Sequence, residues 1–394
     1  MSVKILVVDD EPDLEQLIRQ KFRRNIRDNE FEFLFARSGA DAVAKLEVER
    51  DVELVLTDIN MPEMDGLTLL GKIDELNAKA LKSVVVSAYG DMENIRVAMN
   101  RGAFDFVTKP INLDDLEKTI YKALRESSII KEAVRTRDQL VAIQQELNVA
   151  TEIQMSMLPR AFPSAEERRG VDIFATMKPA KEVGGDLYDF FAVGEHRIGF
   201  VIGDVSGKGV PAALLMGISR TLMRGAGRQG LAAHDCVTAV NRVISEEILP
   251  SMFVTVFYGI FDARTGELEY CSGGHNPPYL VRENGAVEAL SEAGGVPVGV
   301  VSDFKYSSAR VQLRANDTVV VYTDGVTEAT DVNEEEFGEK RLEDLLARLK
   351  TRPAQAIVEE TVAAVNDFAK GVPQRDDITC LALRFVGNGA NPTE

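Results

Sequence analysis

Several strand-like runs in the first third of the chain end in polar residues that could hold a metal ion and a phosphoryl group. The run KILVV is followed by Asp9 and Asp10, and the run ELVLT is followed by Asp58. Carboxylates that meet repel one another unless a cation is bound, so these three predict a Mg²⁺ site. Two further runs end at Ser87 and Lys109, whose side chains could hydrogen-bond and neutralise a phosphoryl oxygen.

A second set of carboxylates lies beyond residue 180. Asp186 begins a strand whose return strand, RIGFVIG, ends at Asp204, and a hairpin places its first and last residues side by side. The strand TVVVYT ends at Asp324, with a turn after it, and Asp376 and Asp377 begin the last strand. If these two strands pair antiparallel, Asp324 and Asp376 also meet at one sheet end.

Four carboxylates in one place cannot all stay ionised without cations. Oxygen ligands without His or Cys select Mg²⁺ or Mn²⁺ over Zn²⁺. Two such ions would generate a hydroxide nucleophile and hold a phosphoryl group for in-line attack. The second set therefore predicts metal-assisted hydrolysis of a phosphate ester.

The elements that must position these residues fall into three parts. Over 1–125, short apolar strands alternate with helices, which predicts a parallel, doubly wound α/β sheet with its ligands at the carboxyl ends of the strands. From Leu113 to Met157 the chain has no glycine or proline and is rich in helix formers. We assign 126–158 as a connecting helix, 159–388 as a second domain and 389–394 as a tail.

The connecting helix carries an apolar seam at three-and-four spacing: Leu140, Ile143, Leu147, Ala150 and Met157. Such a seam predicts a coiled-coil dimer. Arg137 and Asp138 interrupt the repeat, so a helix that folds back on its own chain is the alternative. In either form, this helix is the route from the first domain to the second.

Composition narrows the class of protein. The net charge of the 394 residues is −18, which disfavours nucleic-acid binding. Three cysteines without a CxxC pair argue against a disulfide framework, and three scattered histidines argue against a zinc site. The first residues are a strand and no apolar run reaches membrane-spanning length, so we expect a cytoplasmic protein.

Four short motifs follow one another in residues 3–125: DD, D-x-N-M-P-x-M-D-G, S-A and K-P. Through these motifs the segment resembles the response-regulator receiver domain. The resemblance implies a phosphoacceptor, Asp58, and a sensor histidine kinase as partner. It implies that Mg²⁺ is held by Asp9, Asp10, Asp58 and the carbonyl of Asn60. It further implies a cis bond before Pro110 and a set of switch residues: Ser87, Phe106 and Lys109.

Residues 150–386 resemble the type 2C metal-dependent serine/threonine phosphatases of the RsbU/SpoIIE branch, through ATEIQMSMLP, KEVGGDLYDF, GDVSGKGVPAALLM, SGGHNPP, YTDGVTEA and RDDIT. The implied fold is an α+β sandwich of two β-sheets flanked by helices. The implied catalytic metal ligands, for two Mn²⁺ or Mg²⁺, are Asp186, Asp204, Asp324 and Asp376, with the carbonyl of Val205.

Other residues of these motifs have smaller implied roles. We expect Asp377 not to be a direct ligand, and we expect His275 to shape a turn. Gly184 and Gly185 would allow close approach of the backbone. The branch usually carries no arginine for the substrate phosphate, and none is obvious here.

Together the two resemblances imply a response regulator in which phosphorylation of Asp58 controls a protein phosphatase. Its substrate would be a phosphoserine or phosphothreonine protein such as an anti-sigma-factor antagonist. The alternative is a phosphorylation-gated adaptor, similar in arrangement to RssB, that binds a sigma factor or an anti-sigma partner without catalysis. The four intact aspartates favour catalysis, and a DNA-binding regulator is disfavoured because no basic helix–turn–helix follows the receiver.

Overall fold

The computed structural model describes residues 2–76, 80–88, 91–159, 170–247 and 251–387. The chain divides into two compact units, Met1–Ile143 and Gln144–Glu394, and each is described by itself. The division falls inside the connecting helix. The second unit therefore begins at Gln144, whereas the second domain was predicted to begin at residue 159. The predicted tail, 389–394, lies outside the described residues.

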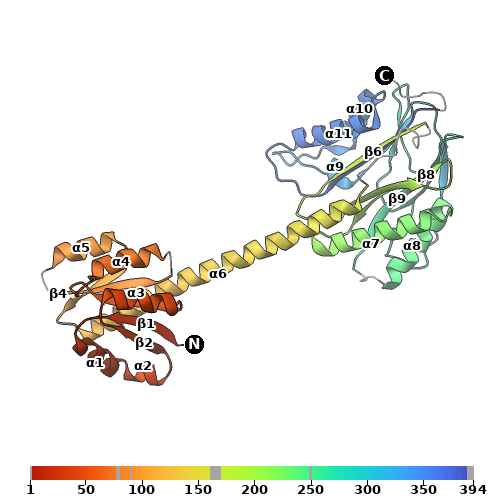
Figure 1. The fold of residues 1–394 in the computed structure, drawn as a ribbon. Coiled ribbons are helices and arrows are strands. Elements are labelled where there is room, and N and C mark those ends of the chain that lie inside the picture. The colour runs from red at the N-terminus through yellow and green to blue at the C-terminus, as the bar shows by residue number, and fades with distance from the viewer. Residues whose placement is uncertain (1, 77–79, 89–90, 160–169, 248–250, 388–394) are drawn as a thin grey trace. The chain divides into compact units, whose positions relative to one another are not determined.

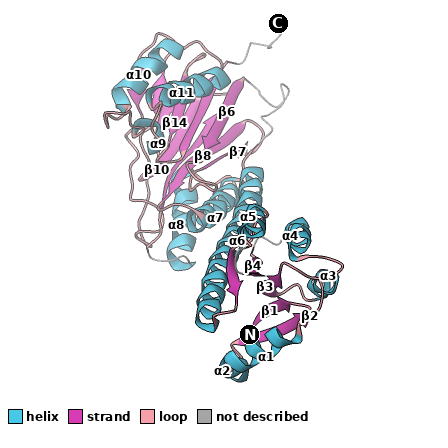
Figure 2. Cartoon of the chain, turned by 90° about the vertical axis from the view of Figure 1, so that its left-hand side faces the viewer, coloured by secondary structure: helices cyan, strands magenta, loops and turns pink. Residues whose placement is uncertain are grey.

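The first unit is a five-stranded parallel sheet with strand order β2-β1-β3-β4-β5, as the alternation of strands and helices predicts (Figures 1 and 2). Its strands are β1 (Val3–Val8), β2 (Phe31–Ala36), β3 (Val52–Asp58), β4 (Lys82–Ala88) and β5 (Asp105–Lys109). Its helices are α1 (Pro12–Lys21), α2 (Arg23–Arg27), α3 (Gly39–Val48), α4 (Gly66–Glu75), α5 (Met92–Asn100) and the beginning of α6 (Leu113–Met157).

Helices cover both faces of this sheet. Apolar residues of α1 and the first turns of α6, among them Ile18 and Ile120, pack with β1 and β3 on one face. On the other face, residues of α3 and α4, among them Ala42 and Leu69, complete the core. Each fully buried Ile or Leu contributes about 1.5–3 kcal/mol. This packing fixes the carboxyl ends of the strands at one edge.

Helix α6 runs without interruption over the residues predicted from the missing glycine and proline. Every residue from 131 to 146 is exposed, including Leu140 and Ile143 of the apolar seam. Coiled-coil pairing of this segment stays a prediction.

The second unit contains two antiparallel sheets, in agreement with the implied α+β sandwich. One has the order β13-β10-β9-β8-β7, and the other has the order β12-β11-β14-β15-β6. The strands of the first sheet are β7 (Leu187–Ala192), β8 (Arg197–Val205), β9 (Val254–Asp262), β10 (Glu267–Gly273) and β13 (Ala309–Gln312). The strands of the second sheet are β6 (Val171–Lys178), β11 (Tyr279–Val281), β12 (Val287–Ala289), β14 (Thr318–Tyr322) and β15 (Ile378–Phe385).

Two groups of helices cover the outer faces of this sandwich (Figure 1). The central core, which includes Phe200 and Phe257, lies between the sheets. Helices α7 (Val210–Gly227) and α8 (Ala233–Glu247) pack on the β7–β10 side. The second group packs on the β14–β15 side and comprises α9 (Asp324–Thr327), α10 (Gly338–Leu349) and α11 (Ala354–Phe368). The turn predicted after Asp324 is thus the short helix α9.

All three cysteines, Cys236, Cys271 and Cys380, are free and buried. Burial raises the pKa of each thiol, to about 11 for Cys236 and about 12 for the other two. They are therefore protonated, structural side chains. Within the described ranges, no helix is both long and apolar enough to cross a bilayer.

Substitution of Gly325 by alanine should destabilise the second unit, because α9 lies directly on the chain before β15. A Cβ at Gly325 would lie 2.0 Å from the carbonyl oxygen of Asp377. We expect Gly325→Ala to lower the free energy of unfolding by about 3 kcal/mol or more. The measurement is urea unfolding of the full chain followed by circular dichroism.

The matched control is Gly225→Ala in α7, where no atom lies within 4 Å of the added Cβ. Because alanine is a better helix former than glycine, this variant should gain roughly 0.5–1 kcal/mol. Equal stability of the two variants would contradict the close packing at Gly325.

Candidate functional sites

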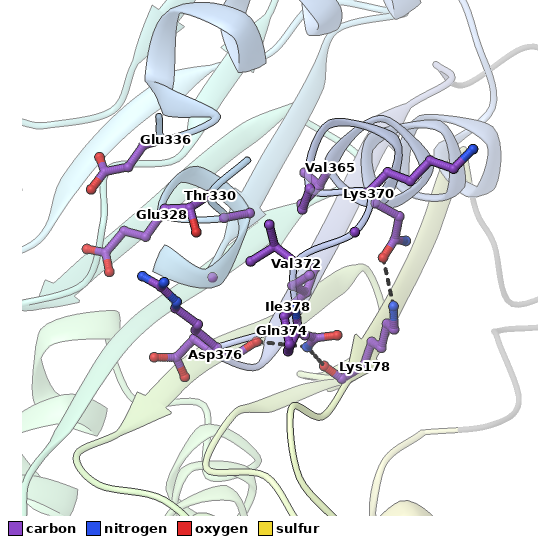
Figure 3. A pocket seen from close by; sticks show the side chains of 17 residues that line it. Lys178, Glu328, Thr330, Glu336, Val365, Lys370, Val372, Gln374, Asp376 and Ile378 are labelled. Atoms are coloured by element: carbon purple, nitrogen blue, oxygen red, sulfur yellow. Dashed lines mark hydrogen bonds between the residues drawn. The ribbon is translucent and has the colours of Figure 1, made fainter. Parts of the chain in front are cut away.

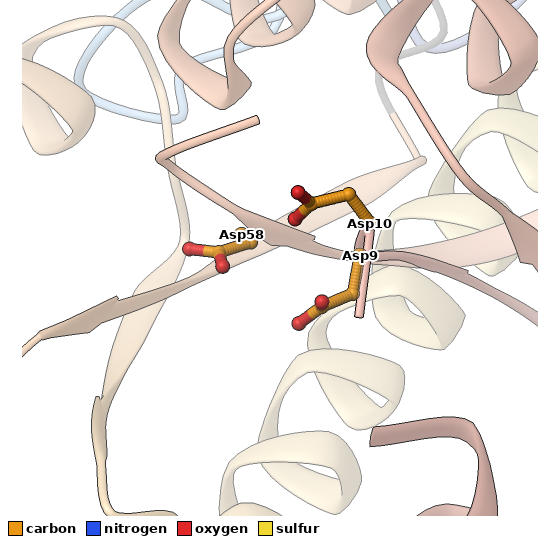
Figure 4. A group of neighbouring side chains, drawn as sticks. All are labelled: Asp9, Asp10 and Asp58. Atoms are coloured by element: carbon orange, nitrogen blue, oxygen red, sulfur yellow. The ribbon is translucent and has the colours of Figure 1, made fainter. Parts of the chain in front are cut away.

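The first site lies at the carboxyl ends of the parallel strands. Asp9 and Asp10 follow β1 and Asp58 ends β3, and Figure 4 shows the three side chains as neighbours. One oxygen from each carboxylate lies within 4.8 Å of the others, which is close enough for one cation. Burial raises the pKa of Asp9, and repulsion from Asp58 adds to this effect. The oxygen donors and their spacing fit Mg²⁺.

Lys109, at the end of β5, neutralises this site. Its Nζ donates to Asp58 Oδ2 at 2.6 Å and to Asp9 Oδ2 at 3.4 Å. Burial alone would lower the pKa of Lys109, but these two carboxylates overcome that effect and raise it. The lysine is therefore charged beside the predicted phosphoacceptor, where it could also bind a phosphoryl oxygen.

The other predicted residues of the first site lie around this centre. The backbone N–H of Asn60 donates to Asp58 Oδ1 at 3.3 Å. Ser87 is buried at the end of β4, and its Oγ donates to Asp91 Oδ2 at 3.4 Å. Phe106 is partly exposed on β5, and the bond between Lys109 and Pro110 is cis as predicted. The functional roles of these residues stay predictions.

The second site begins at the hairpin of β7 and β8. Leu187 pairs with Gly203 in the antiparallel register, so Asp186 and Asp204 are neighbours, as the hairpin predicts. Asp186 is buried, and its Oδ2 accepts hydrogen bonds from Thr323 Oγ1 at 2.7 Å and Thr379 Oγ1 at 2.5 Å. These two threonines, from the β14–β15 side, tie the two sheets together at the carboxylate.

Asp324 and Asp376 reach the same place from the second sheet. Tyr322 of β14 pairs with Cys380 of β15, which confirms the predicted antiparallel pairing. Asp376 contributes to the electrostatic environment of both Asp324 and Asp204. The structure therefore brings the four predicted aspartates into one cluster, although among the described residues only the first site places three carboxylates within 4.8 Å of one another.

The negative charge of three of these aspartates is poorly stabilised by their surroundings. Burial raises the pKa of Asp186, Asp204 and Asp324, and repulsion from neighbouring aspartates adds to each shift. For Asp204 the pKa rises to about 7. A divalent cation would restore the ionised form, and the all-oxygen donor set fits Mg²⁺ or Mn²⁺.

Asp377 has a structural role that the sequence alone did not reveal. Its Oδ1 accepts the N–H of Ala180 at 2.7 Å, and its Oδ2 accepts the N–H of Gly185 at 2.6 Å. A Cβ at Gly184 would lie 2.5 Å from that same Oδ2, so only glycine fits there. Asp377 therefore fixes the loop that carries Asp186, and the expectation that it is not a direct ligand stays a prediction.

Gln154, near the end of α6, is hydrogen-bonded to the same loop. The side-chain amide of Gln154 accepts the N–H of Gly184 at 3.0 Å and donates to its carbonyl oxygen at 2.6 Å. Thr151 Oγ1 also donates to the carbonyl of Glu182 at 2.6 Å. Gln154 occupies the position in the seam between Ala150 and Met157 where an apolar residue is expected. That irregularity is the signal by which the sequence could have identified it.

His275 behaves as a structural residue. Its Nδ1 contacts Thr255 Oγ1 at 2.9 Å and its Nε2 contacts the carbonyl of Tyr322 at 3.0 Å, so Nε2 carries the proton and Nδ1 accepts. Burial lowers the pKa of His275 to about 4, so the ring is neutral at pH 7. These contacts agree with the predicted role in shaping a turn, beside the strand end that leads to Asp324.

A pocket of about 410 Å³ borders the aspartate cluster (Figure 3). Asp376 and Gly325 belong to its lining, and Val365, Val372 and Ile378 supply apolar surface. Its other wall includes Lys178 and Lys370, and Gln374 Nε2 donates to the backbone carbonyls of Lys178 and Asp376. The pocket has room for one or two side chains of a bound polypeptide.

Comparison with known proteins places both sites in families. The sequence profile of the response regulator receiver domain matches residues 5–121, and that of Stage II sporulation protein E (SpoIIE) matches residues 194–386. The chain is 30% identical to phosphoserine phosphatase RsbU of Bacillus subtilis over 246 residues, which are 61% of this chain and 70% of RsbU.

Protein IcfG of Synechocystis sp. is also 30% identical, over 268 residues, which are 60% of this chain but only 41% of IcfG. Among solved structures, the SiaA-PP2C domain of Pseudomonas aeruginosa superposes with a TM-score of 0.56 at 25% identity. That match covers 63% of this chain and 98% of the SiaA domain. The chain therefore belongs to the response regulators that join an N-terminal receiver domain to a C-terminal SpoIIE/RsbU-type PP2C phosphatase domain.

Without divalent metal, the phosphatase domain should lose stability as the pH rises. The pKa of Asp204 is about 7 in the folded protein and lower when the chain unfolds, so the folded state binds more protons between these values. Stability is full below the unfolded pKa and is lost as the pH rises through about 7. In EDTA, Asp204→Asn should therefore raise the melting temperature at pH 8 by about 5 °C, for a gain on the order of 2 kcal/mol.

The control is Asp303→Asn, which removes an exposed aspartate of the same domain. At pH 8, Mn²⁺ should raise the melting temperature of the wild type more than that of Asp204→Asn, because ligand binding stabilises the folded state. An equal response of Asp204→Asn and Asp303→Asn to EDTA, pH and Mn²⁺ would contradict the predicted charge cluster.

Proposed function

We propose that this response regulator is a divalent-metal-dependent phosphatase of phosphoserine or phosphothreonine proteins, controlled by phosphorylation of Asp58. The observation that carries the proposal is the meeting of four aspartates from two sheets in a SpoIIE-type domain, with the pKa raised for Asp186, Asp204 and Asp324. Such a cluster is costly unless cations bind it, so its presence indicates a metal site rather than a structural element.

In this proposal Asp186, Asp204, Asp324 and Asp376, with the carbonyl of Val205, hold two Mn²⁺ or Mg²⁺. Bound there, the ions would supply an activated water and positive charge against the phosphoryl oxygens. The water oxygen bonds to phosphorus as the bond to the serine oxygen breaks, which yields inorganic phosphate and the serine hydroxyl. Asp377, Thr323 and Thr379 position Asp186 for this reaction.

A protein substrate and a kinase partner are part of the same proposal. The relative RsbU is named a phosphoserine phosphatase, and the receiver profile implies a phosphodonor, for which a sensor histidine kinase is the natural candidate. The pocket beside Asp376 supports a polypeptide substrate, because residues next to a bound phosphoserine would lie over it. A sigma-factor regulatory phosphoprotein, such as an anti-sigma-factor antagonist, is the substrate we favour, acting in the cytoplasm.

Control would pass through α6. Asp9, Asp10, Asp58 and Asn60 would hold Mg²⁺ at the receiver site, where Ser87, Phe106 and Lys109 respond to phosphorylation. At the other end of the helix, Gln154 holds Gly184 two residues before Asp186. A rotation or shift of α6 would therefore displace a catalytic carboxylate.

Homodimerisation through α6 would give the receiver a way to move this helix. Its exposed apolar residues, among them Leu140, Ile143 and Ile153, support pairing with a second copy of the chain. The charged interruption at Arg137 and Asp138 would weaken this pairing.

Hydrolysis of p-nitrophenyl phosphate tests catalysis. The wild type should turn over this substrate with Mn²⁺ and lose activity in EDTA. Asp204→Asn should lower kcat/KM by about 100-fold or more, because loss of one carboxylate weakens binding of both ions. Asp303→Asn should retain full activity.

Absence of turnover at every Mn²⁺ concentration, with and without beryllofluoride, would contradict the phosphatase proposal. It would favour the adaptor, whose binding of a sigma factor or anti-sigma partner could then be measured directly.

Beryllofluoride, which mimics phosphorylation of Asp58, tests whether the receiver domain controls the phosphatase domain. In the wild type it should change turnover of p-nitrophenyl phosphate or the dimerisation constant measured by sedimentation. In Gln154→Ala the change in turnover should disappear, because the helix no longer holds Gly184.

Gln145→Ala is the matched control, since Gln145 is an exposed glutamine of the same helix. It should respond to beryllofluoride as the wild type does. If beryllofluoride left both dimerisation and turnover of the wild type unchanged, coupling between the two domains would be refuted.

A further inference from the structure

Lys208 lies inside the cluster of the phosphatase domain. It sits in the SGKG loop between Asp204, on β8, and the start of α7. Its Nζ donates to Asp376 Oδ2 at 2.7 Å and to the carbonyl oxygen of Arg375 at 2.5 Å. Over the described ranges, no other basic side chain hydrogen-bonds to one of the four aspartates.

The loop around Lys208 is open and rich in glycine. Gly207 and Gly209 flank the lysine with φ values of 89° and 80°, in the left-handed region where glycine is favoured. No atom lies within 4 Å of a Cβ built at either glycine. The lysine side chain is 41% exposed and is therefore only partly fixed by its surroundings.

The reaction proposed for this domain needs a cation of this kind. A phosphate monoester brings negative charge to a cluster that already contains four carboxylates, and hydrolysis spreads that charge over the phosphoryl oxygens. Divalent ions at the cluster are partly neutralised by the aspartates that bind them. A lysine ammonium supplies further positive charge, and the N-terminus of α7, two residues later, contributes in the same direction.

Lys208 and a divalent ion would compete for Asp376. The ammonium already holds Oδ2 of this carboxylate. An ion bound by the same carboxylate would weaken this pair and leave the partly exposed ammonium beside the cluster. A phosphoryl group held at the cluster would then lie within reach of the released ammonium.

We propose that Lys208 binds the phosphoryl group of the substrate, and that its pairing with Asp376 opposes metal binding until substrate and metal are both present. This inference rests on the proposed function and adds to it the residue that recognises phosphate. It assigns to a lysine the role for which the sequence offers no obvious arginine.

The experiment compares Lys208→Met and Lys208→Arg with Lys305→Met, which removes an exposed lysine of the same domain. The first measurement is Mn²⁺ affinity of the full chain without substrate, by electron paramagnetic resonance. Lys208→Met should bind Mn²⁺ about three- to tenfold more tightly, because a competing unit charge is removed. Lys305→Met should match the wild type.

The second measurement is made at saturating Mn²⁺ for each variant. For p-nitrophenyl phosphate, Lys208→Met should lower kcat/KM by about 10- to 100-fold and weaken inhibition by inorganic phosphate. Lys208→Arg should retain most of the kcat/KM and most of the inhibition by inorganic phosphate, since arginine also binds phosphate. Tighter Mn²⁺ binding together with lower kcat/KM separates this role from a general loss of folding.

Unchanged phosphate inhibition and unchanged kcat/KM in Lys208→Met would overturn the inference, whatever the Mn²⁺ affinity. Calorimetric titration of the Mn²⁺-loaded chain with inorganic phosphate gives the same comparison without turnover. A wild type that binds phosphate but does not hydrolyse p-nitrophenyl phosphate would contradict the proposed function alone. Equal phosphate affinity of wild type and Lys208→Met would contradict the role of Lys208 alone.

Discussion

Repulsion between buried carboxylates is the constraint on which the phosphatase domain depends. Asp186 and Asp204 come from one sheet, while Asp324 and Asp376 lie at the ends of two strands of the other, so closing the sandwich brings like charges together. The raised pKa values show the cost of that approach. Bound cations or protons are needed to offset this repulsion. The same carboxylates therefore govern both the stability of the domain and its proposed metal chemistry.

The rest of the site holds these charges in place. Asp377 binds the backbone N–H of Ala180 and Gly185, and two threonine hydroxyls bind Asp186. In the receiver domain a permanent cation, Lys109, already contacts Asp58 and Asp9. The two domains thus neutralise their clustered carboxylates in different ways. The receiver carries its own counter-charge at the centre, whereas the described part of the phosphatase offers a single lysine, from a loop in which glycines flank it.

Much of this arrangement could be predicted from the sequence, because it follows from short-range patterns. Alternation of apolar strands with helices placed Asp9, Asp58 and Lys109 at one sheet edge, and hairpin geometry placed Asp186 beside Asp204. The contacts of Gln154 and Asp377 could not be derived in this way. Each joins segments far apart in the chain through side chain to backbone hydrogen bonds, and no periodicity specifies such a partner. The short helix at Asp324 was likewise predicted as a turn, since four residues carry no helical period.

The hydrogen bonds between Gln154 and Gly184 bear on how another sensory domain could be joined to this phosphatase domain. Both residues belong to the second unit, which begins at Gln144, so the contact between the end of α6 and the loop that carries Asp186 lies wholly within the phosphatase domain. The exposed segment 131–146 sets only the length and phase of the helix that leads there. A helix lengthened by seven residues, two turns less about 20°, presents nearly the same face. In evolution or in engineering, another sensory domain could therefore be joined in this segment, provided that whole pairs of turns are added or removed.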